Sequence, residues 1–440
     1  MTAITIGLIC VVALVALIYS GLHLAVALLG VSFLGTIALR GFDQANSLMA
    51  ISATGSIATY EFAVVPLFVL MGQFVLVADM GRDIYRVVNQ LTRRLPGGLG
   101  IGTVIANAIF AAVTGVTIAS VTVFTQIAVP EMRRHGYSPR FAVGVVAGSS
   151  LLGMLIPPSA LFILYGILTE QSIGSLFIAG IIPGLILAGT YIVLIVGWAL
   201  WKPEAFGQTV ERAAQAPKAE LLPWWRLVAL SAPILSLVAV VLGGLYNGYF
   251  TALEAGAVGA TGAFLLALLR GKLTRASLWE TLSSTALVMA SIMLLIIGAS
   301  MFSRLLALTG IPDLLANTIV ALDVSMTVHV LIYALVILIL GTILDSLSIV
   351  LILVPVVAPA FQAVGIDLIW LGVITVIAVE VGLLTPPFGM AVFTIAGMMR
   401  GDREVSLGDV FAGSAPFVFA AWAVTMLLIF VPSLSTMLVY

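Results

Sequence analysis

Two proline pairs with the same local setting are the residues of this chain most suited to a chemical role. Pro157-Pro158 and Pro386-Pro387 each lie inside a long apolar stretch, and an offset of 229 residues relates them. A proline inside a helix removes a backbone donor and clashes with an upstream carbonyl. Carbonyls that lose their helical partners are hard oxygen ligands, which suit a bare cation such as Na⁺. The pairs therefore predict two broken helices that expose carbonyl oxygens to an ion.

The residues around each proline pair repeat with the same offset. Gly153 superposes on Gly382, and both glycines lack a side chain that would keep an ion or another segment away from the backbone. Thr385 adds a hydroxyl to the second site, whereas the equivalent Ile156 adds none to the first. A kink for packing explains a single Pro-Pro pair, but two equivalent copies favour a binding site.

The composition identifies a lipid bilayer as the surroundings of these sites. Of the 440 residues, 62% are hydrophobic and 8% are charged, whereas a soluble protein carries roughly 25% charged residues. The apolar runs are long and helix-like, unlike the roughly 10-residue alternating segments of a β-barrel. The single cysteine, Cys10, excludes an intramolecular disulfide, and the net charge of −1 gives no sign of nucleic-acid binding. The chain is therefore predicted to be an all-α polytopic membrane protein.

Arginine clusters predict a re-entrant hairpin in the first half. Residues 99–130 are apolar and lie between two clusters, namely Arg82, Arg86, Arg93 and Arg94 before them and Arg133, Arg134 and Arg140 after them. By the positive-inside rule both flanks are cytoplasmic. Because two full crossings would need about 40 residues, the segment is predicted to enter and leave on the cytoplasmic side. Its tip is expected near residues 112–117.

A stretch free of lysine and arginine predicts the counterpart in the second half. Neither residue occurs from Leu305 to Met399, which marks the outer side of the membrane. The apolar region 327–362 is therefore predicted to dip in from outside, with its tip near residues 341–346. The proline-broken helices 141–165 and 366–397 then run in opposite directions, which predicts inverted repeats.

The predicted organisation of the chain follows from these assignments. It comprises N-terminal scaffold spans with an interfacial helix (1–60), a first repeat (61–201) with hairpin 99–130 and broken helix 141–165, a cytoplasmic linker with a connecting span (202–249), and a second repeat (250–440) with hairpin 327–362 and broken helix 366–397. The stretches 41–58 and 272–285 are amphipathic and are expected to lie along the interfaces, the latter ahead of a span over 286–308.

Polar residues at membrane depth are functional candidates, because they are costly unless satisfied. Hydroxyls at the hairpin tips either belong to a site or bond back to helix carbonyls, and the sequence leaves both readings open. Asp345 is expected to ligate a cation, carry a proton or cap the helix that follows it. Glu61, Glu254 and Glu380 lie near span ends, where capping or solvated roles are favoured. Glu380, two residues before Gly382, is the best functional candidate among these glutamates.

Several motifs of the chain occur together in one known family. They include Pro66-Leu67-Phe68 through Gly72, Gly97-Gly98-Leu99, Arg134-His135-Gly136-Tyr137, Gly180 through Gly184, and Glu380-Val381-Gly382 through Pro387. With these motifs the chain resembles, nearly end to end, the large membrane subunit of tripartite ATP-independent periplasmic (TRAP) transporters, the DctM-like family. The resemblance implies an elevator-type secondary transporter of the bacterial inner membrane, driven by a Na⁺ gradient. It also implies two partners, a periplasmic substrate-binding protein and a small four-span membrane subunit.

The resemblance further implies two ion sites where the hairpin tips meet the broken helices. Some ligands are expected to act through the backbone only. The first Na⁺ site is expected to use Thr114, Gly115, Gly153, Ile156 and Pro158, and the second Gly341, Asp345, Gly382, Thr385 and Phe388. The tips depart from the family where Val116 separates two threonines and where Ser346 follows Asp345 in place of a frequent proline. The ion sites are expected to survive these changes.

The expected substrate is a small organic anion, a carboxylate, which is imported with Na⁺. We expect it to bind near mid-membrane between the tips, where half-helix N-termini carry partial positive charge. The hydroxyls expected to contact it belong to Thr117, Ser120, Ser159, Ser346 and Ser348. The alternatives are a stand-alone Na⁺-coupled anion carrier, an intramembrane hydrolase, which would need a catalytic partner for Asp345, and a channel. No organic cofactor is expected, and the small subunit is expected to be a separate chain.

Overall fold

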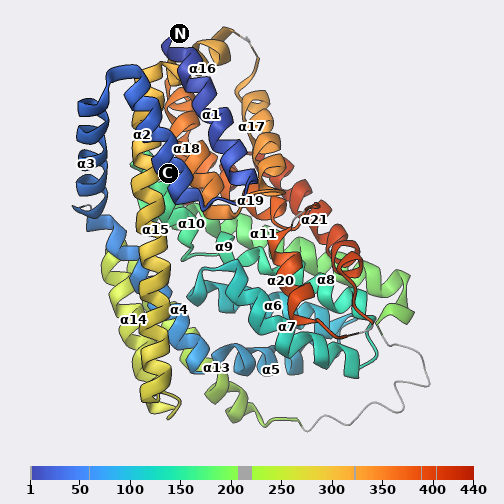
Figure 1. The fold of residues 1–440 in the computed structure, drawn as a ribbon. Coiled ribbons are helices and arrows are strands. Elements are labelled where there is room, and N and C mark those ends of the chain that lie inside the picture. The colour runs from blue at the N-terminus through green and yellow to red at the C-terminus, as the bar shows by residue number, and fades with distance from the viewer. Residues whose placement is uncertain (1, 59, 207–220, 322–323, 388, 403) are drawn as a thin grey trace.

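The computed structural model describes residues 2–58, 60–206, 221–321, 324–387, 389–402 and 404–440 (Figure 1). Throughout these residues the regular structure is helical, apart from one isolated bridge between Tyr137 and Phe206. Among them, 7 helices are long and apolar enough to cross a membrane, or up to 8 if the bent pair Val64–Val77 and Met80–Thr92 forms one span. The predicted all-α polytopic membrane fold is therefore confirmed.

The two halves are joined by the linker predicted after residue 201, of which residues 207–220 lie outside the described part. The first half contains α1 (Ala3–Tyr19), α2 (Leu24–Arg40), α3 (Phe42–Ala58), η1 (Tyr60–Ala63), α4 (Val64–Val77), α5 (Met80–Thr92), α6 (Gly98–Thr114), α7 (Thr117–Arg134), α8 (Pro139–Ser150), α9 (Leu152–Leu155), α10 (Ala160–Thr169), α11 (Ile173–Trp201) and η2 (Pro203–Ala205). The second half contains α13 (Trp224–Tyr246), α14 (Ala252–Leu269), α15 (Arg275–Thr309), α16 (Ile311–Ala321), α17 (Met326–Gly341), α18 (Ser346–Ala363), α19 (Leu368–Gly382), α20 (Met390–Met398), α21 (Leu407–Phe430) and α22 (Ser433–Thr436).

Helix bounds in the two halves recur at the offset that relates the proline pairs. Shifting α7 by 229 residues reproduces the bounds of α18, and shifting α2 reproduces those of α14 to within about one residue. α8 and α19 begin at equivalent residues, and α10 and α20 end at equivalent residues and begin within about one residue of each other. Since α2 precedes residue 61, the correspondence begins earlier in the chain than the predicted first repeat.

One long helix replaces two elements that the sequence suggests. An interfacial stretch over 272–285 and a separate span over 286–308 were expected, whereas α15 runs unbroken for 35 residues. Its N-terminus is fixed by a capping box between Thr274 and Ser277, and its only glycine or proline is Gly298. Because no glycine or proline lies at the expected boundary near residue 285, the helix continues through it. In the first half, by contrast, η1 separates α3 from α4, and Pro66 lies in the first turn of α4, where a proline is tolerated.

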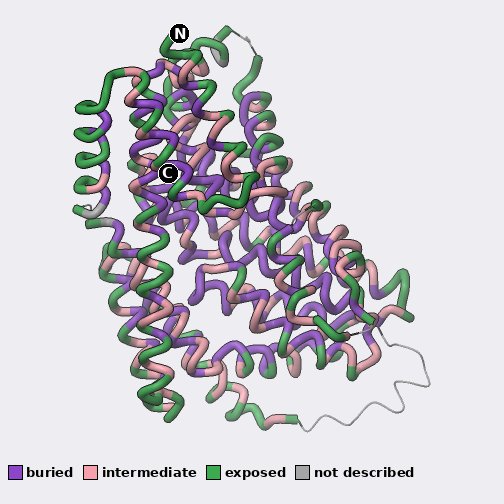
Figure 2. The backbone as a smooth tube through the Cα atoms, in the orientation of Figure 1, coloured by how far each residue is buried: buried purple, intermediate pink, exposed green. Residues whose placement is uncertain are grey.

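Small residues bring the central helices into close contact. A Cβ atom placed on Gly144 of α8 would lie 2.2 Å from the carbonyl oxygen of Gly413 on α21, and one on Gly148 would lie 2.4 Å from Cβ of Phe417. Small residues allow helix backbones to approach one another in this way within a membrane. α19 packs against α21 in the buried interior, and all of its residues are buried (Figure 2). This enclosed helix carries Glu380 into the centre of the molecule.

Candidate functional site

The first hairpin ends in a short turn at a left-handed glycine. α6 ends at Thr114, Gly115 has a φ of 60°, and α7 begins at Thr117. A Cβ atom on Gly115 would lie 2.5 Å from the carbonyl oxygen of Pro158, and the Ala160 amide donates a 3.3 Å hydrogen bond to the Gly115 carbonyl. Only glycine combines this φ with so close an approach. Gly115 therefore docks the hairpin tip onto the first proline pair, and the turn falls inside the predicted tip.

The first proline pair separates α9 from α10. Ser159 caps α10 by accepting a 3.4 Å hydrogen bond from the Phe162 amide. Within the described residues, the carbonyl oxygens of Ile156 and Pro158 accept no hydrogen bond. The break thus leaves hard oxygen atoms without a partner beside the first tip, as the proline pattern predicts.

Gly153 lies against the start of α7. A Cβ atom on it would lie 3.2 Å from Cα of Thr117 and 3.4 Å from Oγ of Ser120. The hydroxyl of Thr114 donates back to the Phe110 carbonyl at 3.0 Å, so its proton is already used within α6. The five residues predicted for the first Na⁺ site, Thr114, Gly115, Gly153, Ile156 and Pro158, therefore gather where the first hairpin meets the first broken helix.

The second hairpin turns more widely and carries a cap. α17 and α18 lie in the upper part of Figure 1 and α6 and α7 in the lower part, and residues 342–345 separate α17 from α18. Asp345 caps α18, accepting a 3.2 Å hydrogen bond from the Ser348 amide and a second from the Ser348 hydroxyl. Of the three roles expected for Asp345, the structure thus contains the cap. The same contacts commit Ser348, predicted to touch substrate, to the carboxylate of Asp345.

The second hairpin docks onto the second broken helix through two glycines. A Cβ atom on Gly382 would lie 2.6 Å from Cα of Gly341, so the two backbones touch. The hydroxyl of Thr385 donates to the Val381 carbonyl at 2.8 Å, and within the described residues the Thr385 carbonyl accepts no hydrogen bond. Four of the five residues predicted for the second Na⁺ site thus flank one junction, and the fifth, Phe388, lies outside the described residues.

The carboxylate of Glu380 lies where both hairpins meet. Glu380 is only 1% exposed. The Thr117 hydroxyl donates a 2.5 Å hydrogen bond to its Oε2, and the Ser346 hydroxyl donates a 3.1 Å hydrogen bond to its Oε1. Across the described residues, no basic side chain forms an ion pair with it. The sequence marks Glu380 as the best functional candidate among three glutamates but assigns it to no site. Its position within an apolar segment, two residues before Gly382, was the only sequence feature that pointed to a role.

The five hydroxyls predicted to contact substrate differ in their hydrogen-bond partners. Thr117 and Ser346 bond to Glu380, Ser348 bonds to Asp345, and Ser159 caps α10. Ser120 is fully buried, and its hydroxyl has no hydrogen-bond partner among the described residues. The structure therefore brings two of these five side chains onto one acceptor and leaves one of them unpartnered.

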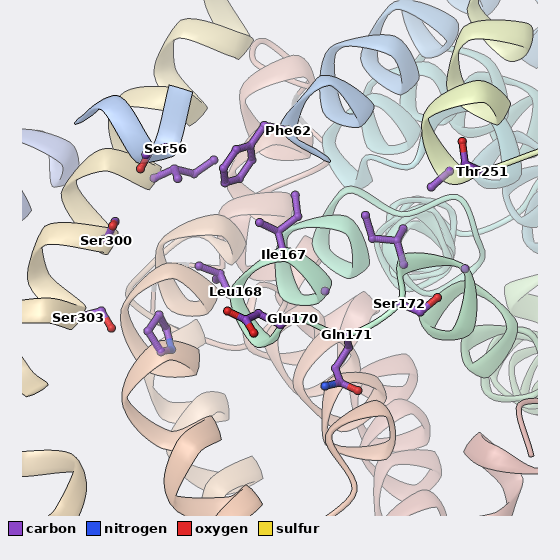
Figure 3. A pocket seen from close by; sticks show the side chains of 18 of the residues that line it. Ser56, Phe62, Ile167, Leu168, Glu170, Gln171, Ser172, Thr251, Ser300 and Ser303 are labelled. Carbon is purple, nitrogen blue, oxygen red and sulfur yellow. The ribbon is translucent and has the colours of Figure 1, made fainter. Parts of the chain in front are cut away.

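Two large cavities flank this central region. The first, of about 1110 Å³, lies between α15 and the α10–α11 junction, and Figure 3 shows Ser300 and Ser303 on one side of it and Glu170 and Gln171 on another. The second, of about 980 Å³, is bounded by α5, α7 and α13, and the arginines among its lining residues are Arg82, Arg86, Arg93, Arg134 and Arg226. These arginines lie in the segments predicted to be cytoplasmic, whereas Arg304 of the first cavity directly precedes the lysine- and arginine-free stretch that is predicted to mark the outer side.

The end of the first hairpin away from its tip is tied to the loop before α21. Arg133 on α7 forms an ion pair with Asp402 and a second, at 2.6 Å, with Glu404. The Glu404 amide also donates a 3.0 Å hydrogen bond to Asp402, and this bond and the nearby guanidinium lower the pKa of the Asp402 carboxyl. The second hairpin lacks an equivalent pair, because the residue that corresponds to Arg133 is the uncharged Gln362.

Comparison with known proteins places this arrangement in a family. Residues 11–434 match the family model of the tripartite ATP-independent periplasmic transporter, DctM component. The chain is 31% identical over 408 residues to the C4-dicarboxylate TRAP transporter large permease protein DctM of Pseudomonas aeruginosa, with 92% of each chain covered. It is also 31% identical over 343 residues to the sialic acid TRAP transporter large permease protein SiaM of Vibrio cholerae, with 78% of each covered.

Solved structures show the same fold at greater distance. The YdaH transporter of Alcanivorax borkumensis superposes with a TM-score of 0.64 at 15% identity, covering 88% of each chain. At this identity the likeness concerns the fold alone, whereas the family match extends over most of the sequence. The relatives are transporter permeases rather than enzymes. This chain therefore belongs to the DctM family of TRAP transporter large permease subunits and is a multi-pass protein of the bacterial inner membrane.

Proposed function

We propose that this chain is the large membrane subunit of a Na⁺-coupled TRAP transporter that imports a small organic anion, a carboxylate. The observation that carries the proposal is the docking of each hairpin tip on its own broken helix. Gly115 meets Pro158 in the first half, and Gly341 meets Gly382 in the second. Two broken helices at corresponding places are the usual frame of a secondary transporter's binding site.

Sodium coupling is supported by the oxygen atoms at the two junctions. The carbonyls of Ile156, Pro158 and Thr385 accept no hydrogen bond within the described residues, and such hard oxygens suit an alkali cation. The proposed ligands of the first ion are Thr114, Gly115, Gly153, Ile156 and Pro158, and those of the second are Gly341, Asp345, Gly382, Thr385 and Phe388. Asp345 would supply a negative charge to the second ion in addition to capping α18.

A carboxylate substrate is supported by the relatives and by helix ends. Two relatives of equal identity are named for C4-dicarboxylate and for sialic acid, which are both organic acids. The N-termini of α7 and α18 meet near Glu380, and a helix N-terminus favours negative charge. The proposed substrate contacts remain Thr117, Ser120, Ser159, Ser346 and Ser348, of which Ser120 has a free hydroxyl among the described residues.

The proposed transport cycle moves the hairpins and the broken helices as one body against the remaining helices. This elevator arrangement rests on inverted repeats, which the recurrence of helix bounds at one offset supports. The proposed partners are a small four-span membrane subunit and a periplasmic binding protein that delivers the substrate, as the tripartite family name suggests. A stand-alone Na⁺-coupled carrier is the alternative within the same class.

Uptake into proteoliposomes tests this proposal. Liposomes containing this chain and its small subunit would receive an inward Na⁺ gradient, with and without the cognate binding protein and labelled C4-dicarboxylate or sialic acid. We expect uptake to require both the gradient and the binding protein. Uptake without the binding protein would establish the stand-alone carrier, and uptake indifferent to Na⁺ would remove both ion sites.

A matched pair of variants tests the second ion site in the same assay. Thr385→Val removes the hydroxyl at the second break and should raise the Na⁺ concentration for half-maximal uptake about tenfold. Thr394→Val is the control, because the Thr394 hydroxyl bonds back to the Met390 carbonyl within α20 at 2.9 Å, just as Thr385 bonds to Val381. Equal Na⁺ dependence in the two variants would exclude the Thr385 hydroxyl as a ligand.

A further inference from the structure

Two equivalent hydroxyls meet one carboxylate that has no equivalent. Thr117 and Ser346 are related by the 229-residue offset, and each is the first residue of the second helix of its hairpin. Both donate to Glu380. The position that corresponds to Glu380 in the first half is Leu151, which is 1% exposed. The pairing therefore breaks the symmetry of the two halves and joins them through a single residue.

The burial of Glu380 makes these two bonds important. A carboxylate enclosed by protein is costly unless hydrogen-bonded, and hydrogen bonds to a charged acceptor are stronger than neutral ones. The α7 N-terminus has no side-chain cap, since Val116 precedes it, and the Glu380 carboxylate places an anionic group at that helix end through its hydrogen bond with Thr117. Ser346 brings the N-terminus of α18 to the other carboxylate oxygen.

The neighbours of the two hydroxyls are the residues proposed to hold Na⁺. Thr117 lies two residues after Gly115 and touches Gly153, whereas Ser346 directly follows Asp345. Glu380 itself lies two residues before Gly382, whose backbone touches Gly341. A displacement of either tip therefore moves a hydroxyl that is bonded to Glu380.

We infer that Glu380 is a positioning residue that couples the two hairpin tips, so that cation binding at one tip raises affinity at the other. The inference rests on the proposed function for the identity of the cation. Its structural part, the link between Thr117 and Ser346 through Glu380, stands on the contacts alone. Glu380 touches neither ion in this scheme and acts through the two hydroxyls.

The structural part is tested by a double-mutant cycle in Na⁺-free buffer. Thermal unfolding of the full chain would be compared for Thr117→Val, Ser346→Ala and the double variant, first with Glu380 present and then with Glu380→Leu, the residue found at position 151. We expect the two changes to be non-additive with Glu380 present and additive with Glu380→Leu, because contacts that share a partner do not act independently. Additive effects in the presence of Glu380 would overturn the link.

The coupling is tested by Na⁺ titration of the same proteins, with the unfolding temperature as the readout. Glu380→Leu should reduce the Hill coefficient for Na⁺ to about 1 and weaken half-maximal binding about tenfold, the usual effect of losing an outer-shell partner of a metal site. Glu380→Gln, which keeps one acceptor and can still bond both hydroxyls, should restore much of the cooperativity. A lower unfolding temperature with an unchanged Hill coefficient would reduce Glu380 to a structural role and overturn the inference.

A control and a fallback keep the two proposals separate. Thr122→Val on α7 removes a hydroxyl that bonds only to the Ile118 carbonyl and should change neither readout. If the parent protein shows no response to Na⁺, the Na⁺ part of the proposed function fails, and the Na⁺-free cycle alone decides whether Glu380 links the tips. If Glu380→Leu does not fold, the Glu380→Gln background serves for the cycle, with reduced but non-zero coupling as the expected result.

Discussion

The two hairpins share a helical frame but end differently. The first turns at a single left-handed glycine, Gly115, and its second helix has no side-chain cap. The second turns through residues 342–345, and Asp345 caps the helix that follows. The helix bounds nevertheless match at one offset. The helical frame therefore tolerates different tips, because helix positions depend on packing along the whole helix whereas tip chemistry depends on a few residues.

The equivalent glycines of the two broken helices, Gly382 and Gly153, differ in how closely they approach their hairpins. Gly382 and Gly341 meet backbone to backbone, with 2.6 Å from a Cβ placed on Gly382 to Cα of Gly341. In the first half, the corresponding distance from Gly153 to Cα of Thr117 is 3.2 Å. Gly382 therefore leaves no room for a side chain, whereas Gly153 can accept a small one after a slight adjustment.

The largest loss of stability is expected when a side chain is added at the second junction. Gly382→Ala should lower the free energy of unfolding by about 1–3 kcal/mol, the usual cost of overpacking, because the new methyl group meets the Gly341 backbone. The loss would be measured by thermal unfolding in detergent. Gly153→Ala is the matched control and should cost clearly less. Equal losses at the two positions would contradict the difference in closeness between the junctions.

A smaller effect separates the two roles of Asp345. Asp345→Ala should cost about 1 kcal/mol of unfolding free energy in Na⁺-free buffer through loss of the cap. The cost should increase in saturating Na⁺, because only the parent protein gains binding free energy at the second tip. Differential unfolding with and without Na⁺ measures both values.

The control for this prediction is another helix cap. Asp367→Ala removes the cap at the far end of α19, where Asp367 accepts hydrogen bonds of 2.7 and 3.1 Å from the Ile369 and Trp370 amides. Its cost should be the same in both buffers. If Asp345→Ala behaves in the same way, Asp345 is a cap and not an ion ligand.

The smallest effect concerns pH and the first hairpin alone. The Glu404 amide and then the Arg133 guanidinium lower the pKa of Asp402, so both contacts stabilise the folded protein at pH values above the ordinary pKa of about 3.9. That contribution is lost as the pH falls through the lowered value. The effect should be small, since solvent screens this pair.

Arg133→Gln tests the pH dependence directly. The difference in unfolding temperature between the parent protein and this variant should be constant near neutral pH and should shrink as the pH falls below about 4. Gln362→Ala, at the equivalent place in the second hairpin, should show a difference that does not depend on pH. A difference that stays constant down to about pH 3 for Arg133→Gln would show that Asp402 does not contribute to the ion pairs of Arg133.

Much of the fold is accessible from the sequence because its signals are local. Proline pairs interrupt helices where they stand, and charge clusters bound the apolar segments, so both hairpin turns fall inside the predicted tips. The prediction of two separate elements over 272–285 and 286–308 was wrong. The change from an amphipathic to an apolar pattern does not end a helix where no glycine or proline interrupts it. The correspondence of α2 with α14 was not predicted, because the two helices share their bounds at this offset but no sequence motif.

The membrane class, the family, the broken helices and the glycines that allow close approach could all be predicted from the residues alone. Those properties follow from composition and from backbone chemistry at single positions. Which side chains meet depends instead on how the helices pack. Glu380 bonds to Thr117 across 263 residues of chain and to Ser346 across 34, and no spacing along the sequence marks either contact. The packing of α7, α18 and α19 brings these three residues together, because each helix buries the face that carries one of them.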